Sequence, residues 1–243
     1  AIRKNSDHIQ LFGLQFYINY ETYFNAYADD IDYEMLTSPH KILVNGNYYV
    51  LNTEKIKYET GISLRYKHIF NFKGIKQEKN ILLLGSFIEA DTKYMLNSVK
   101  DFTNVIFINH PAVNIQRFGK FPTNITISNE NIYKLFEDTK LVIATASGTS
   151  VEAVSCGISV IIMASQDNLT ANPLLEKGKG KIWDIAFNLN EISDIYKKLI
   201  DYRIYNKAEI TEIANWYKEN FFVEPTEQNI IKVFDLEEGQ ITQ

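Results

Sequence analysis

Four short apolar runs stand out along the chain, and none of them alternates with polar residues. They begin at Ile81, Val105, Leu141 and Ser159 and read ILLL, VIFI, LVIA and SVIIM. A strand with one face in water alternates apolar and polar side chains, so uninterrupted runs of this length are typical of strands buried on both faces. The pattern therefore predicts strands of a parallel sheet.

Each interval between these runs contains a segment that can form a crossover helix, at residues 91–102, 131–139 and 149–156. Strands that alternate with helices predict an open sheet with right-handed crossovers. We therefore expect an α/β fold, a Rossmann-like open parallel sheet with flanking helices.

The flanking regions are less regular. Residues 1–38 are aromatic and irregular, although LFGLQFY at 11–17 has the character of a strand. Residues 40–66 read as a strand, a helix and a short extended segment, and IWDIAFNL at 182–189 reads as a further strand. Three helices are expected after these, with Pro225 between the last two: 190–204, 207–222 and 226–236.

Composition narrows the class of protein. With 45% hydrophobic and 23% charged residues, the 243-residue chain is ordinary for a globular protein, and its net charge of −5 argues against a general nucleic-acid binder. The single cysteine, Cys156, excludes an internal disulfide and fits a reducing compartment. No apolar run approaches the roughly 20 residues of a membrane-spanning helix. The start AIRKNSDHIQ has neither a signal peptide nor an initiator methionine, which suggests a trimmed chain.

In an open parallel sheet, ligands bind beyond the carboxyl ends of the strands, and three loops follow predicted strands here. The first contains Gly85 and Ser86, either as a simple turn or as a place where a ligand approaches the backbone. A lone glycine falls short of the dinucleotide fingerprint G-x-G-x-x-G. The second contains His110, held extended by Pro111, and Arg117 seven residues later. An imidazole and a guanidinium can both donate hydrogen bonds to phosphate.

The third loop, within LVIATASGTSVEAVSCGISVIIM, places small hydroxyl residues where a strand meets a helix. Thr149 and Glu152 have the spacing of a capping box, and Gly157 is placed to end the helix. The cap does not require Ser147, Gly148 and Ser150 as well. Because free N–H groups at a helix start attract anions, we interpret this loop as a phosphate site.

Other candidates favour structural roles. Asp30 and Asp32 form a D-x-D pair, but no strand precedes them, so we expect an acidic turn. Cys156 is expected in the core. The four histidines are too far apart for a local metal site: His8, His40, His68 and His110. We therefore expect neither a metal nor a cofactor.

The order of these motifs resembles the carboxy-terminal, donor-binding half of GT-B glycosyltransferases that build bacterial surface polysaccharides such as capsule and lipopolysaccharide. In that half an H-P dipeptide follows one strand, and S-S-x-x-x-E-A-x-x-x-G-x-P-V opens a later helix. This chain has Ser159 where that pattern has proline. The resemblance covers about residues 35–185 and is greatest to transferases that use cytidine-nucleotide donors.

The resemblance implies a metal-independent glycosyltransferase that takes a sugar from a CMP- or CDP-linked donor to a surface glycan acceptor. His110 would contact the donor phosphate, Ser147, Thr149 and Ser150 would hold its oxygens, and Glu152 would either cap the helix or reach the ribose. The expected location is the cytoplasm, either free or peripherally associated with the inner face of the cytoplasmic membrane.

The implied division is a remnant of the amino-terminal GT-B domain at residues 1–75, a donor-binding domain at 76–205, and helices at 206–243 that pack back across the cleft. The general base would belong to the amino-terminal half, so the chain alone is expected to be inactive. Two alternatives stay open. A UDP-N-acetylglucosamine 2-epimerase has S-G-G-x-x-E-E, whereas Ala153 replaces its second acidic residue here. The other is a non-catalytic nucleotide-sugar-binding module.

Overall fold

The computed structural model describes residues 3, 9–20 and 27–236. The chain divides into two compact units: residues 72–216 form one, and residues 1–71 together with 217–243 form the other. The second unit therefore contains both ends of the chain. Within the described ranges, no helix has the length and apolar character that crossing a bilayer requires.

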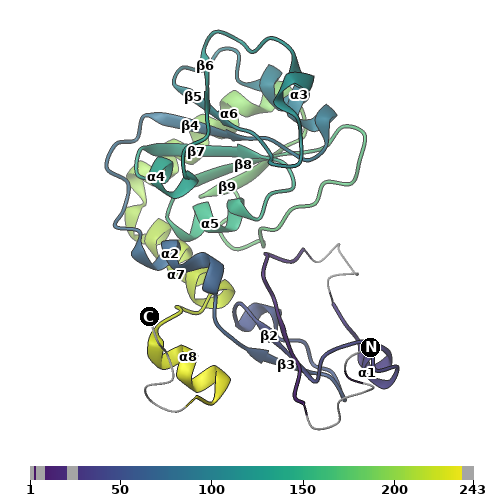
Figure 1. Cartoon of the computed structure of the whole chain (residues 1–243). Coiled ribbons are helices and arrows are strands. Elements are labelled where there is room, and N and C mark those ends of the chain that lie inside the picture. The colour runs from purple at the N-terminus through teal and green to yellow at the C-terminus, as the bar shows by residue number, and fades with distance from the viewer. Residues whose placement is uncertain (1–2, 4–8, 21–26, 237–243) are drawn as a thin grey trace. The chain divides into compact units, whose positions relative to one another are not determined.

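The unit of residues 72–216 is built on a six-stranded sheet in the order β6-β5-β4-β7-β8-β9, with every pair parallel (Figure 1). The strands are β4 Asn80–Leu84, β5 Val105–Ile108, β6 Ile125–Ser128, β7 Thr139–Ala144, β8 Ser159–Met163 and β9 Trp183–Ala186. The α/β fold with a parallel sheet is thus confirmed, as are the four apolar strands and the strand within 182–189. Strand β6 was not predicted. It is an edge strand with partly exposed side chains, so it lacks an apolar run.

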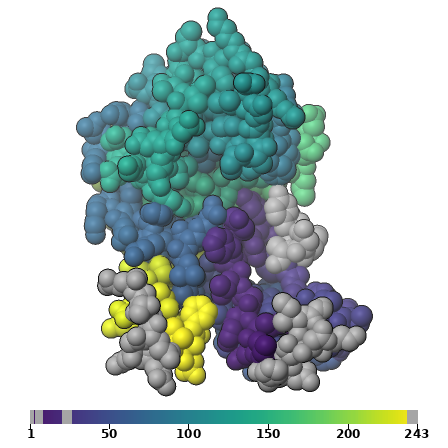
Figure 2. Space-filling model, viewed as in Figure 1, coloured from purple at the N-terminus to yellow at the C-terminus, as the bar shows by residue number. Residues whose placement is uncertain are grey.

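Four helices cover the two faces of this sheet (Figure 1): α3 Glu89–Ser98, α4 Ile132–Phe136, α5 Thr149–Ser155 and α6 Ile192–Tyr205. Helices α3 and α6 share one core with alternate residues of the strands, such as Leu83 and Ile143. Helix α5 contacts β7 and β8 from the opposite face, with α4 beside it. Both faces are therefore buried, which explains the uninterrupted apolar runs. Figure 2 shows this unit as one closely packed body, largely teal in this view.

The other unit has a smaller parallel sheet in the order β1-β2-β3. Its elements are β1 Phe12–Leu14, α1 Asp30–Glu34, β2 Lys41–Val44, η3 Asn47–Tyr49, β3 Lys57–Thr60, η4 Leu64–Tyr66, α2 Lys67–Asn71 and α8 Glu227–Phe234, and α7 Lys207–Phe221 leads into it from the larger unit. The strand in 11–17 and the three terminal helices are confirmed.

The helix expected within 40–66 is wrong, because only a 3₁₀ turn lies between β2 and β3. Buried Ile56 and Tyr58 flank exposed Lys57, which is the two-residue period of a strand.

The carboxyl-terminal segment is hydrogen-bonded into this smaller unit. The Ser63 backbone N–H donates to the Val223 oxygen at 2.9 Å, and the Val223 N–H donates to Ser63 Oγ at 3.0 Å. Gly46 lies so close to the same segment that an added Cβ would be 2.4 Å from the Asn220 oxygen. Only glycine permits this approach of two backbones.

Candidate functional site

The strand order of the larger sheet determines which loops meet. If the strands of this sheet are numbered 1 to 6 along the chain, their order across the sheet is 3-2-1-4-5-6. The chain adds strands outward on one side of β4 and then, from β7, on the other side. The strand order therefore reverses between β4 and β7, although all the strands are parallel. Ligands of open α/β sheets bind at the carboxyl edge beside such a reversal. The loops after β5, β4, β7 and β8 follow one another along this edge, because Leu84 pairs with Ile108 and Ala144 pairs with Ile162. His110 and the serine-rich loop thus lie at one edge, separated by β4.

The loop after β4 is in direct contact with the loop after β5. The Gly85 N–H donates to the Ile108 oxygen at 2.8 Å, and an added Cβ on Gly85 would lie 3.1 Å from the His110 nitrogen. Ser86 is buried, and its Oγ accepts from the Ile88 N–H at 3.0 Å. Gly85 therefore permits a close backbone approach, while Ser86 holds the turn that leads into α3.

The His110 ring has a defined hydrogen-bond partner. Its Nδ1 accepts from the Ala112 N–H at 3.2 Å, in the turn that Pro111 begins. Because Nδ1 is the acceptor, the proton of a neutral ring is assigned to Nε2, which is left as a donor. The ring is half-buried and stands edge-on to Phe87, with the centroids 6.2 Å apart.

Arg117 lies on the 3₁₀ helix η5 (Ile115–Phe118), which contacts α3. Its Nη1 is 3.8 Å from Glu89 Oε2, and its side chain is largely exposed. Glu89 also bonds Lys93, and this bond is the main reason why the pKa of Glu89 is lowered. Arg117 thus has a carboxylate partner at the first turn of α3, and its role toward a ligand stays a prediction.

The capping box predicted at the serine-rich loop is wrong. Gly148 is the N-cap of α5, no side chain bonds the cap, and Thr149 is the first helical residue. The carboxylate of buried Glu152 instead accepts a hydrogen bond from the Tyr133 hydroxyl of α4. A helix can begin without a side-chain cap if water or a ligand satisfies its first N–H groups.

The start of α5 leaves donors and hydroxyls available. Within the described part of the chain, the backbone N–H groups of Gly148 and Thr149 donate to no atom. The Thr145 and Ser150 hydroxyls are buried without a partner among those residues, whereas Ser147 and Thr149 are half-buried. Buried polar groups are normally paired, but the Thr145 and Ser150 hydroxyls are enclosed, so the side chains that a ligand at this loop can reach are those of Ser147 and Thr149.

Sequence reasoning missed two residues at this edge, Thr145 and Asn109. Asn109 follows β5 directly; its Nδ2 donates to the Val113 oxygen at 2.7 Å, and its buried Oδ1 has no partner within the described ranges. The signal was present, since both residues are the first polar ones after an apolar run.

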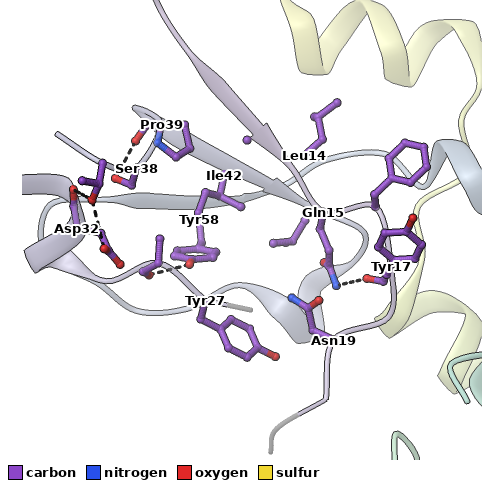
Figure 3. Close-up of a pocket in the computed structure, with 15 residues that line it drawn as sticks. Leu14, Gln15, Tyr17, Asn19, Tyr27, Asp32, Ser38, Pro39, Ile42 and Tyr58 are labelled. Atoms are coloured by element: carbon purple, nitrogen blue, oxygen red, sulfur yellow. Dashed lines mark hydrogen bonds between the residues drawn. The ribbon is translucent and has the colours of Figure 1, made fainter. Parts of the chain in front are cut away.

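The smaller unit contains a cavity of about 580 Å³ on one face of its sheet (Figure 3). The residues that line it include the strand residues Ile42, Val44 and Tyr58 and, around them, Tyr17, Tyr27 and Asp32. Many of its polar groups are satisfied within the unit: Gln15 Nε2 donates to the Tyr17 oxygen at 2.9 Å, and the Tyr58 hydroxyl donates to the Ala28 oxygen at 2.7 Å. No sequence motif indicated this cavity, because it is lined by several separate segments between residues 13 and 58.

The remaining candidates have structural explanations or carry no ligand signal. Asp30 accepts backbone hydrogen bonds from Glu54, Lys55 and Ile56, which lower its pKa. Cys156, expected in the core, is only half-buried at the end of α5. Among the residues that the structure describes, no three His, Cys, Asp or Glu side chains are grouped to hold a metal ion. His8 lies outside them.

Comparison with known proteins identifies the fold. No family model matches the sequence, and no curated protein matches it. The structure is similar to TarM, with a TM-score of 0.52 and 14% identity over 95% of this chain and 50% of TarM. It is also similar to MurG from Acinetobacter baumannii, with a TM-score of 0.50 and 13% identity over 97% of this chain and 69% of MurG. Both are GT-B glycosyltransferases, so the predicted GT-B fold is confirmed. The chain spans half the length of TarM.

Proposed function

We propose that this chain is the donor-binding portion of a metal-independent glycosyltransferase that uses a CMP- or CDP-linked donor and a surface glycan acceptor. One observation carries the proposal: the reversal of strand order places three sets of groups at one sheet edge. These are the Gly85–Ser86 turn, which packs against the His110 backbone, the Nε2–H of His110, and the N–H groups of Gly148 and Thr149, which have no partner among the described residues.

These groups suit a phosphate. A helix start carries a partial positive charge, and its N–H groups point outward along the axis. Hydrogen bonds from His110 and from the hydroxyls of Ser147 and Thr149 would surround the same anion. The direction of N–H donors at a helix start is fixed by the helix backbone, so little reorganisation is needed when an anion binds.

The same groups explain how transfer would be accelerated. Glycosyl transfer breaks the bond between the sugar carbon and a phosphate oxygen, and negative charge grows on the departing nucleotide. Fixed donors aimed at that charge stabilise the transition state more than the ground state. Glu152, held by Tyr133 beside the loop, would accept hydrogen bonds from the ribose hydroxyls. The general base is assigned to the amino-terminal half.

Calorimetric titration of the chain with CMP, CDP and UDP tests the proposal. Binding of a cytidine nucleotide with a preference over UDP is expected. A preference for UDP would favour the epimerase-like alternative, and no binding of any nucleotide would contradict the proposal and favour a scaffold role. A non-catalytic binding module would bind cytidine nucleotides, yet it would transfer no sugar even when joined to a complete amino-terminal GT-B domain.

A further inference from the structure

A second cavity, of about 310 Å³, lies in the larger unit between α3 and the loop after β8. Its walls are formed by Ala90, Asp91, Lys93, Tyr94, Asn97, Gln166 and Asp167. Its volume is at the small end of the range for ligand pockets. We name it the α3 cavity.

The α3 cavity is acidic. Asp91 is only 5% exposed, and the one hydrogen bond of its side chain within the described residues is from Ser165 Oγ to its Oδ1, at 2.7 Å. Its Oδ2 is therefore left for an occupant. The cation of Lys93 is already paired with Glu89, at 2.6 Å. Asp167 is exposed and makes no ion pair among those residues.

The neutral groups of the α3 cavity are also available. The Tyr94 hydroxyl and the Asn97 amide make no hydrogen bond within the described part of the chain. A carboxylate accepts hydrogen bonds, an amide can donate and accept, and a phenol can do either. Such a set matches adjacent hydroxyls, each of which can donate to one group and accept from another. It does not suit an anion, because two carboxylates face it and the lysine is already paired.

Both walls of the α3 cavity begin at the carboxyl edge of the sheet. Helix α3 follows the Gly85–Ser86 loop, and the Ser86 N–H donates to Thr92 Oγ1 at 2.8 Å. The loop after β8 stands beside the loop after β7, since β7 and β8 are paired. One end of the α3 cavity, where Ser165 bonds Asp91, therefore lies near the carboxyl edge, on the face of the sheet that α3 covers.

We propose that the α3 cavity holds the transferred group of the donor, and that this group is an uncharged, hydroxyl-rich unit and not an acidic sugar. The inference rests on the proposed nucleotide site and adds the class of group that is transferred. It separates neutral hexoses and polyols from sugars that carry a carboxylate.

The test compares donors that differ in that charge. UDP-glucose and UDP-glucuronate form a matched pair, and CDP-glucose with CDP-glucuronate extends it to cytidine; each is titrated calorimetrically at low salt. With whichever nucleotide the chain binds, we expect the neutral donor to bind at least about tenfold more tightly than the acidic donor. Repulsion from one like charge a few ångströms away has an effect of that order. In the double variant Asp91→Asn/Asp167→Asn, the ratio of the affinities for the neutral and the acidic donor should fall to about threefold or less.

Three variants separate charge from structure. Ser165→Ala removes the partner of Asp91 without changing charge, and Asp101→Asn removes an equal charge from an exposed residue outside the cavity; both should keep the preference. Asp167→Asn alone should reduce it even if Asp91→Asn fails to fold. Nucleotide binding with equal affinity for both members of a pair, or a gap unchanged in the variants, overturns this inference only. Absence of all nucleotide binding overturns the proposed function and the inference with it.

Discussion

Two substitutions at His110 separate its contact with a ligand from its role in the turn. His110→Ala removes both the Nε2–H donor and the Nδ1 acceptor that bonds the Ala112 N–H at 3.2 Å. His110→Asn removes the long donor but keeps an acceptor near the backbone, because an asparagine oxygen bonds the N–H two residues on in an Asx turn.

The magnitudes follow from these two bonds. A hydrogen bond to a charged group contributes about 1.5–3 kcal/mol, so both variants should bind a nucleotide about 10- to 150-fold more weakly. The turn bond is neutral and half-exposed, so its loss in His110→Ala should lower the free energy of unfolding by about 0.5–1 kcal/mol. In His110→Asn the free energy of unfolding should stay close to the original value.

Calorimetric titration with CDP measures the affinity, and urea unfolding measures stability in the same preparations. The expected result is a shared loss of affinity with a loss of stability confined to the alanine variant. If both variants keep their nucleotide affinity to within about twofold, His110 does not bind the phosphate, and the site as described is refuted.

Three further predictions concern other elements. Thr149→Ala should lower nucleotide affinity but leave the thermal midpoint nearly unchanged, because this side chain does not cap α5; a clear loss of stability would contradict that. The buried guanidinium of Arg203 lies 2.7 Å from half-exposed Glu78, and burial lowers its pKa while Glu78 opposes this. A double-mutant cycle of Arg203→Met and Glu78→Gln, measured by urea unfolding, should give a coupling free energy of about 1 kcal/mol between the two side chains. A value near zero would show that this ion pair does not stabilise the fold. Backbone bonds, that from Ile56 foremost, lower the pKa of Asp30 in the folded state. The stability it contributes is therefore present above about pH 4, its unfolded value, and is lost as pH falls through the lower folded value. Asp30→Asn should flatten urea stability against pH in that window, and an unchanged slope would refute this role.

Much of the larger unit could be predicted because its signals are local. An apolar run such as that of β4 is sufficient to indicate a strand buried on both faces, and helical spacing between such runs indicates crossovers. Strand β6 gave no such signal, since its sequence ITIS is partly exposed at the sheet edge. A helix was wrongly predicted between β2 and β3 for a related reason. The two-residue period that identifies β3 as a strand extends over only a few residues.

The site was predictable in its residue types but not in its bonds. The sequence places His110 and the small hydroxyl residues after strands, and the rule for carboxyl edges then selects their loops. Whether Thr149 or Gly148 occupies the cap depends on the exact backbone turn, and whether Glu152 reaches back or bonds Tyr133 depends on where α4 packs. Such choices differ by single hydrogen bonds, which tertiary contacts readily override.

The amino-acid sequence alone determined the α/β class, the direction of the main strands and the loops that carry polar residues, because short-range periodicity encodes which side chains are buried. Only the tertiary structure decided the strand order, with its reversal between β4 and β7, and the two cavities. These features depend on which strands pair across long stretches of chain, and that choice reflects the packing energy of the whole unit, which no local pattern records.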